Sequence, residues 1–342
     1  YFTVLSLGIK SEIVLVAALA FAYIFFKTRS SLRSVAAIAA VVFAFSLVST
    51  PALTSQLNLG LSQSQLFAGY LLITYLLIIV SFGLAKPGMS STILRRIRLR
   101  GVHFPAMALF GSFLVHPTIL TSGIAEDFGL LIVSTFVVYL VWQVATIFDD
   151  ISEQGEETQV SGYLGYGALI AVMALLTAIP SGLVPWLLTF LAVCLAVGYP
   201  TLRRRHWLLS GLIIGAGSCI AFLFGASIRY ASPPSPEPSG LVALAVFAVF
   251  SGASLLKDVT NVERDRQSGI PTVFTQFEKS RALPIVASFV AVGFVLPAAL
   301  ISDIFDDILF FAMGGCACFL ILLMRDRSYR PILAMYLSLI HI

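Results

Sequence analysis

The chain has 342 residues, of which 58% are hydrophobic and only 11% are charged. An ordinary soluble domain is about 45–50% apolar and about 25% charged, so this composition excludes a water-soluble globular protein. The formal net charge of +4 gives no reason to invoke a nucleic-acid partner.

Apolar stretches of roughly 17–22 residues recur along the chain, each long enough to cross a hydrocarbon core as a helix. Lipid offers no hydrogen-bond partner to the backbone, so we expect every such stretch to be helical. In chain order, we predict spans at 11–27, 34–54, 66–86, 103–122, 128–149, 160–181, 183–199, 207–229, 239–257, 282–302 and 304–324. The predicted fold class is all-α, a polytopic transmembrane helical bundle.

The basic residues support this set of spans. If the loops are numbered from the first span, all 21 Lys and Arg residues except Lys10 and Arg229 fall in alternate loops. Basic residues concentrate on the cytoplasmic side of membrane proteins. We therefore predict a multi-pass protein of the cell membrane whose basic loops face the cytoplasm. We also expect membrane lipids to be among its partners.

An acidic cluster follows the fifth predicted span. Five carboxylates occur without an intervening Lys or Arg, at Asp149, Asp150, Glu153, Glu156 and Glu157. If the helix continues past the membrane surface, Asp149, Glu153 and Glu156 share one face. Clustered like charges repel unless a cation neutralises them, although a solvated acidic loop is the alternative for this segment alone.

A second polar loop follows the ninth predicted span. Asp258, Asn261 and Asp265 stand at positions i, i+3 and i+7, which predicts one helical face. Gly269 and Pro271 are expected to end that helix. A simple ion-pair patch with the neighbouring Arg residues is the alternative interpretation.

Two such loops in one bundle indicate a shared site. Mg²⁺ prefers carboxylates together with phosphate oxygens of a ligand. Cations bound between the loops would hold a diphosphate at the mouth of an apolar cavity. The pattern therefore indicates a substrate with a diphosphate head and a long apolar tail.

The second loop, KDVTNVERDRQSGIPTV, resembles a signature of the UbiA superfamily of intramembrane prenyltransferases. That signature has the form K-D-x-x-D-x-E-G-D-x-x-x-G-I-x-T followed by a hydrophobic residue. The matching residues are Lys257, Asp258, Glu263, Asp265, Gly269, Ile270 and Thr272. Asn261 replaces the middle Asp, and Arg264 replaces a Gly.

The first loop is similar to the other family signature, N-D-x-x-D-x-x-x-D, but less closely. Asp149 and Glu153 align with the last two acidic positions, and Ala145 stands where Asn is expected. The stretch from Tyr199 to Arg205 is similar to a Tyr-then-basic loop that family members often carry.

The resemblance implies a nine-helix core. We expect an N-terminal module of about three transmembrane helices over residues 1–100, of unknown role, and a UbiA-like prenyltransferase core over residues 101–342. The chain lacks an initiator Met and ends inside an apolar run, so we expect a longer reading frame and a truncated last core helix.

The resemblance also implies a mechanism with Mg²⁺ as cofactor and a prenyl diphosphate and a lipophilic acceptor as partners. The implied catalytic residues are Asp149, Glu153, Asp258 and Asp265. The implied metal ligands are these four together with Asp150 and Asn261. The implied diphosphate-binding residues are Arg203, Arg204, Lys257, Arg264 and Arg266. We expect His103 and His116 to be interfacial or helix-end residues.

Two other functions stay open from the sequence. The departures at Ala145, Asn261 and Arg264 also suit a degenerate family member that binds isoprenoid diphosphate or lipid without turnover. A transporter with acidic gates is less well supported, because transporter ion sites usually lie near the midplane of the bilayer.

Overall fold

The computed structural model describes residues 101–119, 125–154, 157–230, 239–299 and 304–323, the segment 71–79, and a few single residues or pairs between 17 and 69. The chain forms two compact units, Tyr1–Tyr70 and Leu71–Ile342. The second unit holds every element discussed below. The predicted spans at 11–27 and 34–54 lie largely outside the described residues, and the module boundary near residue 100 stays a prediction.

The described residues form helices joined by short turns and contain no strand, so the predicted all-α bundle is confirmed. The longer helices are α6 (His103–Val115), α7 (Ala125–Gln154), α8 (Glu157–Ala178), α9 (Leu183–Leu202), α10 (Trp207–Ser227), α11 (Ser239–Lys257), α14 (Lys279–Ala298) and α15 (Ile304–Leu322). The shorter elements are η2 (Ile179–Ser181), η3 (Asp258–Thr260), α12 (Val262–Gln267) and α13 (Val273–Gln276).

Six helices are long and apolar enough to cross a membrane, which makes the chain a multi-pass membrane protein. They cover Asp127–Ser152, Leu164–Ser181, Leu183–Leu202, Trp207–Ser227, Gly240–Lys257 and Lys279–Ala298. Since the described residues cover only part of the chain, the total of eleven spans stays a prediction.

The predicted span at 103–122 is wrong at its end, because α6 stops at Val115. The next residue, His116, has φ −126° and ψ 71° and precedes Pro117. Proline disfavours the helical conformation in the residue before it, which explains the early end.

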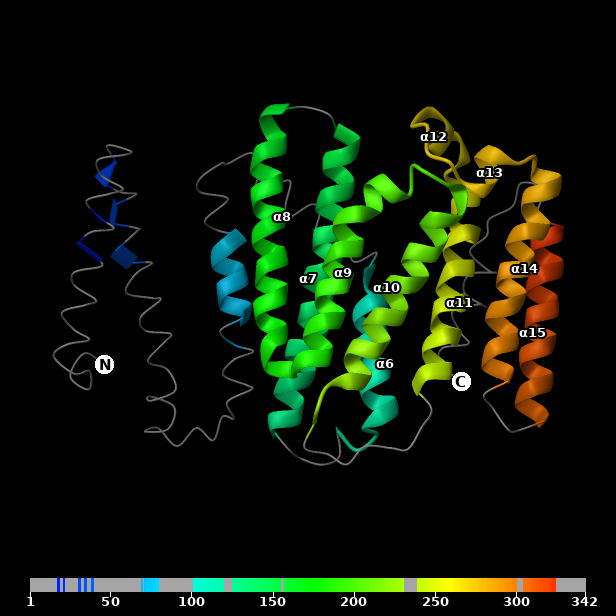
Figure 1. Cartoon of the computed structure of the whole chain (residues 1–342), viewed down its shortest axis with the longest axis horizontal. Coiled ribbons are helices and arrows are strands. Elements are labelled where there is room, and N and C mark those ends of the chain that lie inside the picture. The colour runs from blue at the N-terminus through cyan, green and yellow to red at the C-terminus, as the bar shows by residue number, and fades with distance from the viewer. Residues whose placement is uncertain are drawn as a thin grey trace. The chain divides into compact units, whose positions relative to one another are not determined.

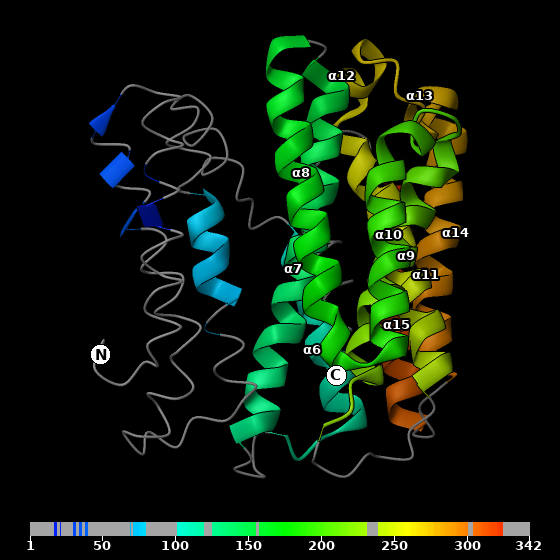
Figure 2. The ribbon, with the colours of Figure 1, turned by 60° about the vertical axis from the view of Figure 1, so that its left-hand side comes forward.

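The helices run side by side along a common direction (Figures 1 and 2). Helix α10 lies centrally and packs against α6, α9 and α11, while α7 packs against α6, α8 and α9. Helices α8 and α15 lie at opposite edges of this group in Figure 1. We call the end of the bundle at which α7 and α11 terminate the acidic end, because Asp149 and Asp258 lie there.

The opposite end of α6 and α10 is tightly packed, and we call it the closed end. A Cβ atom on Gly225 would collide with the Ala108 carbonyl, so the two helix backbones are in direct contact. Small residues allow such close approach of helices in membranes. The Ser112 and Tyr230 hydroxyls are hydrogen-bonded at 2.9 Å beside this contact.

Candidate active site

A cavity of about 800 Å³ lies between α7, α9, α10 and α11. Its volume falls within the range of about 300–1,000 Å³ that small-molecule sites usually have. Most of the wall consists of apolar side chains, and the charged residues of the wall gather at the acidic end. The shape therefore suits an amphiphilic ligand with its charged head at that end.

The two acidic loops meet at this cavity although they are far apart in the sequence. Helix α7 supplies Asp149 and Asp150 near its end, and the segment after α11 supplies Asp258, Asn261 and Asp265. All five residues line the cavity. The predicted convergence of the two loops is present in the fold.

The single helical face predicted from Asp258 to Asp265 is wrong in detail. The chain forms the 3₁₀ turn η3, breaks at Asn261 with φ −107° and ψ 7°, and continues as α12. These angles lie in the bridge region, where many active-site residues are found. The prediction that Gly269 ends the helix is confirmed: its φ is +65°, and the amide of Ile270 donates to the Asp265 carbonyl at 2.8 Å.

Arg203 forms a two-point ion pair with Asp149. Its Nη2 lies 2.9 Å from Oδ1, and its Nη1 donates to Oδ2 at 3.2 Å. The guanidinium also lies 5.5 Å from the centre of the Tyr199 ring. The side chains of Arg203 and Asp149 are only 10% and 26% exposed. Because water screens this ion pair little, Arg203 neutralises the negative charge of Asp149 effectively.

Asp258 is the most deeply buried carboxylate described at this end, at 5% exposed. Its Oδ2 atom has no hydrogen-bond partner. Burial raises the pKa of its carboxyl from 3.8 to about 7, against the lowering effect of Lys257. The Asp265 carboxylate adds to the rise in pKa, and Arg203 opposes it.

These residues fit a divalent cation that is held jointly with a ligand. Among the described residues, no three His, Cys, Asp or Glu side chains converge on one metal position. Mg²⁺, however, usually takes only one or two carboxylates and completes its shell with phosphate oxygens and water. The unpartnered Oδ2 of Asp258, with Asp265 and Asn261 nearby in the same wall, suits that mode of binding.

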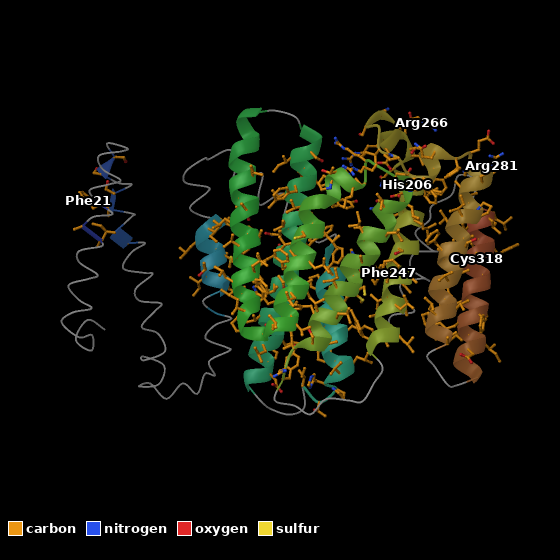
Figure 3. The ribbon with its side chains drawn as sticks, in the orientation of Figure 1. Phe21, His206, Phe247, Arg266, Arg281 and Cys318 are labelled. Atoms are coloured by element: carbon orange, nitrogen blue, oxygen red, sulfur yellow. The ribbon has the colours of Figure 1, made fainter. Side chains whose placement is uncertain are left out.

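The basic candidates separate into two groups. Arg203, Lys257 and Arg264 line the cavity. Arg204 instead donates to the Ser152 carbonyl at 2.8 Å in an exposed position. Arg266 lies at the acidic end on α12 (Figure 3) and sits 3.7 Å from Glu263, with both side chains largely exposed. The backbone of Glu153 lies in the last turn of α7, and its side chain is outside the described residues.

The cavity also has an aromatic wall, which the sequence motifs did not indicate. It contains His103, Phe104, Trp142 and Phe250. His103 and Phe250 are stacked with ring centres 5.2 Å apart, and Phe104 and Trp142 lie 5.1 Å apart. His103 begins α6, as predicted for a helix-end residue, and it also lines the cavity. The helical repeat could have indicated these aromatic residues in the sequence. Trp142 lies two turns before Asp149, and Phe250 lies two turns before Asp258, so each pair shares a helix face.

The model of the UbiA prenyltransferase family matches residues 154–337. No curated protein matches the chain at a significant level. Among solved structures, a UbiA homolog from Archaeoglobus fulgidus is similar with a TM-score of 0.54 at 17% identity, over 72% of this chain and 94% of that chain.

Two further structures have the same fold. The Cd²⁺-bound UbiA homolog from Archaeoglobus fulgidus gives a TM-score of 0.53 at 16% identity, over 70% of this chain and 95% of that one. A structure concerning digeranylgeranylglyceryl phosphate synthase in membranes gives 0.51 at 15% identity, over 73% and 94%. At these identities the likeness establishes the fold.

Proposed function

Because the chain belongs to the UbiA prenyltransferase family, we propose that it transfers a prenyl group from a prenyl diphosphate to a lipophilic acceptor within the membrane, with Mg²⁺ as cofactor. The observation that carries this proposal is the meeting of two acidic loops at one end of a long apolar cavity. Such a site separates a charged head from an apolar tail.

In the proposed mechanism, Asp258, Asp265 and Asn261 would hold Mg²⁺ together with the diphosphate. Asp149, Asp150 and Glu153 are the candidate ligands on the α7 side. Bound Mg²⁺ would stabilise the negative charge that develops on the leaving diphosphate.

Lys257, Arg203 and Arg264 would bind diphosphate oxygens directly, because all three line the cavity. Positive groups placed where negative charge develops lower the barrier to breaking the allylic carbon–oxygen bond. The exposed Arg204 and Arg266 would add only to the general positive field at this end.

The wall below the carboxylates would protect the allylic cation. Trp142, Phe104 and Phe250 exclude water, and aromatic faces attract cations. An electron pair of the acceptor then forms the new carbon bond, and the acceptor loses a proton. The acidic end would face the cytoplasm, as the distribution of Lys and Arg predicts.

Binding without turnover is the second candidate function. It is favoured by the ion pair that occupies Asp149 and by Ala145, which lines the cavity where the family signature has Asn. Both features reduce the number of oxygen ligands available on the α7 side.

The experiment is a titration of purified protein in detergent with geranylgeranyl diphosphate, with and without Mg²⁺. We expect Mg²⁺-dependent binding that is lost in Asp258→Ala and in Asp265→Ala but kept in Glu278→Ala, an exposed carboxylate outside the cavity. Release of diphosphate in the presence of an acceptor panel would separate transfer from binding alone. Folded protein without Mg²⁺-dependent binding would contradict both functions.

A further inference from the structure

The cavity extends far below the carboxylates, along one face of α9. The lining residues of α9 include Leu188, Ala192, Ala196 and Tyr199, and Arg203, directly after the helix, also lines the cavity. Steps of three or four residues keep the same helix face toward the cavity. At 1.5 Å per residue, the distance from Leu188 to Arg203 is about 22 Å.

Two other helices give the same depth independently. On α7 the lining residues run from Val137 to Asp149, which is about 18 Å of helix. On α10 they run from Ser210 to Phe224, which is about 21 Å. The cavity is therefore roughly 20 Å deep, measured from the acidic end.

The deep half of the cavity is walled by fewer helices than the upper half. The lining residues of α11 go no deeper than Phe250, and those of α6 no deeper than Phe104. Below this level, among the residues that the structure describes, only those of α7, α9 and α10 line the cavity. The aromatic wall therefore marks the transition from a broad upper chamber to a lower compartment formed by three helices.

The lower compartment has a closed floor. Phe224, Thr189 and Val137 lie there and are at most 2% exposed. On the side of α10 that faces α6, Gly225 is in backbone contact with Ala108, so α10 is also tightly packed at this depth. A linear chain that enters from the acidic end meets packed helices at this point.

Resting on the function proposed above, the geometry points to a length limit for the donor: the cavity accepts a linear prenyl tail of about four isoprene units, and Phe224 sets the limit. Each unit adds four carbon–carbon bonds of about 1.5 Å along the chain, or about 5 Å when extended. With the diphosphate held at the acidic end, a depth of roughly 20 Å accommodates about four units.

Steric fit is the only source of this selectivity. The tail enters from lipid or detergent, which is about as apolar as the cavity wall, so added length gains little hydrophobic free energy. A tail that is too long must displace the packed side chains of the floor. A tail that is too short leaves wall atoms without contacts.

The first test is competitive binding of all-trans C10, C15, C20 and C40 prenyl diphosphates at saturating Mg²⁺. We expect the tightest binding at C20 and at least about tenfold weaker binding at C40, a difference that competition resolves easily. Equal affinity for C20 and C40 would overturn the length limit while leaving the proposed function intact. Absence of Mg²⁺-dependent binding at every length would overturn the proposed function and this inference with it.

Two variants change the length of the cavity in opposite directions. Phe224→Ala frees about one isoprene unit of length, so it should improve the binding of a C25 prenyl diphosphate relative to C20 by at least about threefold over the same ratio in the wild type. Phe222→Ala is the matched control, because Phe222 is equally buried on α10 but packs against Phe110 and does not line the cavity.

Ala192→Phe should raise the floor by filling the middle of the cavity. We expect it to weaken C20 binding by about tenfold and to leave C10 binding unchanged. This variant keeps the test decisive if the floor variant does not fold. An unchanged length profile in folded Ala192→Phe protein would overturn the inference.

Discussion

Asp258 is a buried carboxylate that lacks a hydrogen-bond partner for one of its oxygens. In a protein interior, such a group either binds a cation or stays protonated. Because burial raises the pKa of this carboxyl to about 7, the protonated form prevails below that pH when no cation is bound. A side chain of this kind is poised to exchange a proton for a metal ion.

The raised pKa predicts a specific dependence of stability on pH. Between the unfolded value of 3.8 and about 7 the folded protein holds the extra proton, so stability falls as pH rises through this range. Asp258→Asn removes the effect. We expect the free energy of unfolding of this variant, taken relative to the wild type at the same pH, to increase by on the order of 2 kcal/mol as the pH rises from 5 to 8.

The measurement is the thermal midpoint of both proteins in detergent with a chelator, at each pH. Comparison with the wild type at the same pH cancels the titration of all other groups. A difference between the two proteins that does not change with pH would contradict the buried, protonated state of Asp258.

The ion pair between Arg203 and Asp149 predicts unequal roles for neighbouring arginines. Arg203→Ala leaves a partly buried carboxylate uncompensated and should destabilise the protein by about 2 kcal/mol or more. Arg204→Ala removes an exposed contact and should change stability by less than about 0.5 kcal/mol. Thermal unfolding of both variants tests this difference.

A double variant separates the ion pair from other effects of Arg203. Adding Asp149→Asn to Arg203→Ala should recover part of the lost stability, since it removes the uncompensated charge. No recovery in the double variant would show that Arg203 acts mainly through other contacts.

Helices α6 and α10 meet through glycine, and this contact seals the closed end of the bundle. A side chain at Gly225 would press on the Ala108 backbone, which cannot move independently of its helix. Close contact through small residues replaces the hydrophobic driving force that is absent within a membrane. The packing of this helix pair therefore holds α10, which carries Phe224, in place.

We predict that Gly225→Ala destabilises the protein by about 2 kcal/mol, as overpacking typically does. Gly315→Ala on α15 is the matched control, because no neighbouring atom lies within 4 Å of its added Cβ. That variant should be neutral or stabilising by up to about 1 kcal/mol, since alanine favours helix. Equal thermal midpoints for the two variants would contradict the close contact.

The whole molecule has a predicted orientation that cysteine labelling can test. Ser268 is exposed at the acidic end, and Ile179 is 56% exposed after α8, at the opposite end. An impermeant thiol reagent applied to intact cells should label Ile179→Cys and leave Ser268→Cys unlabelled until the cells are opened. The parent chain, whose cysteines are Cys194, Cys219, Cys316 and Cys318, provides the background.

Much of the fold could be read from the sequence because its signals are local. The span predicted at 239–257 coincides with α11, and the span predicted at 207–229 differs from α10 by two residues at one end. An uninterrupted apolar run within lipid must be helical, and a polar loop must end it. The acidic loops and the family motif were likewise visible as short stretches of chain.

The site was only partly predictable, because backbone geometry and partners are not local properties. The pairing of Asp149 with Arg203 joins segments that lie far apart in the chain, and the break at Asn261 has no counterpart in the regular spacing of the motif. The signature matches at Asp258 and Asp265 identified candidate ligands. They carried no information about which basic residues line the cavity and which remain outside it.

The sequence alone was sufficient for the all-α membrane class, most helix positions in the described part of the chain, and the candidate carboxylates. The fold was needed to reveal the depth of the cavity, its aromatic wall and the floor at Phe224. The physical reason is that both faces of a transmembrane helix are apolar. Hydropathy therefore cannot distinguish a side chain that faces lipid from one that faces an apolar cavity, and only helix packing makes that distinction.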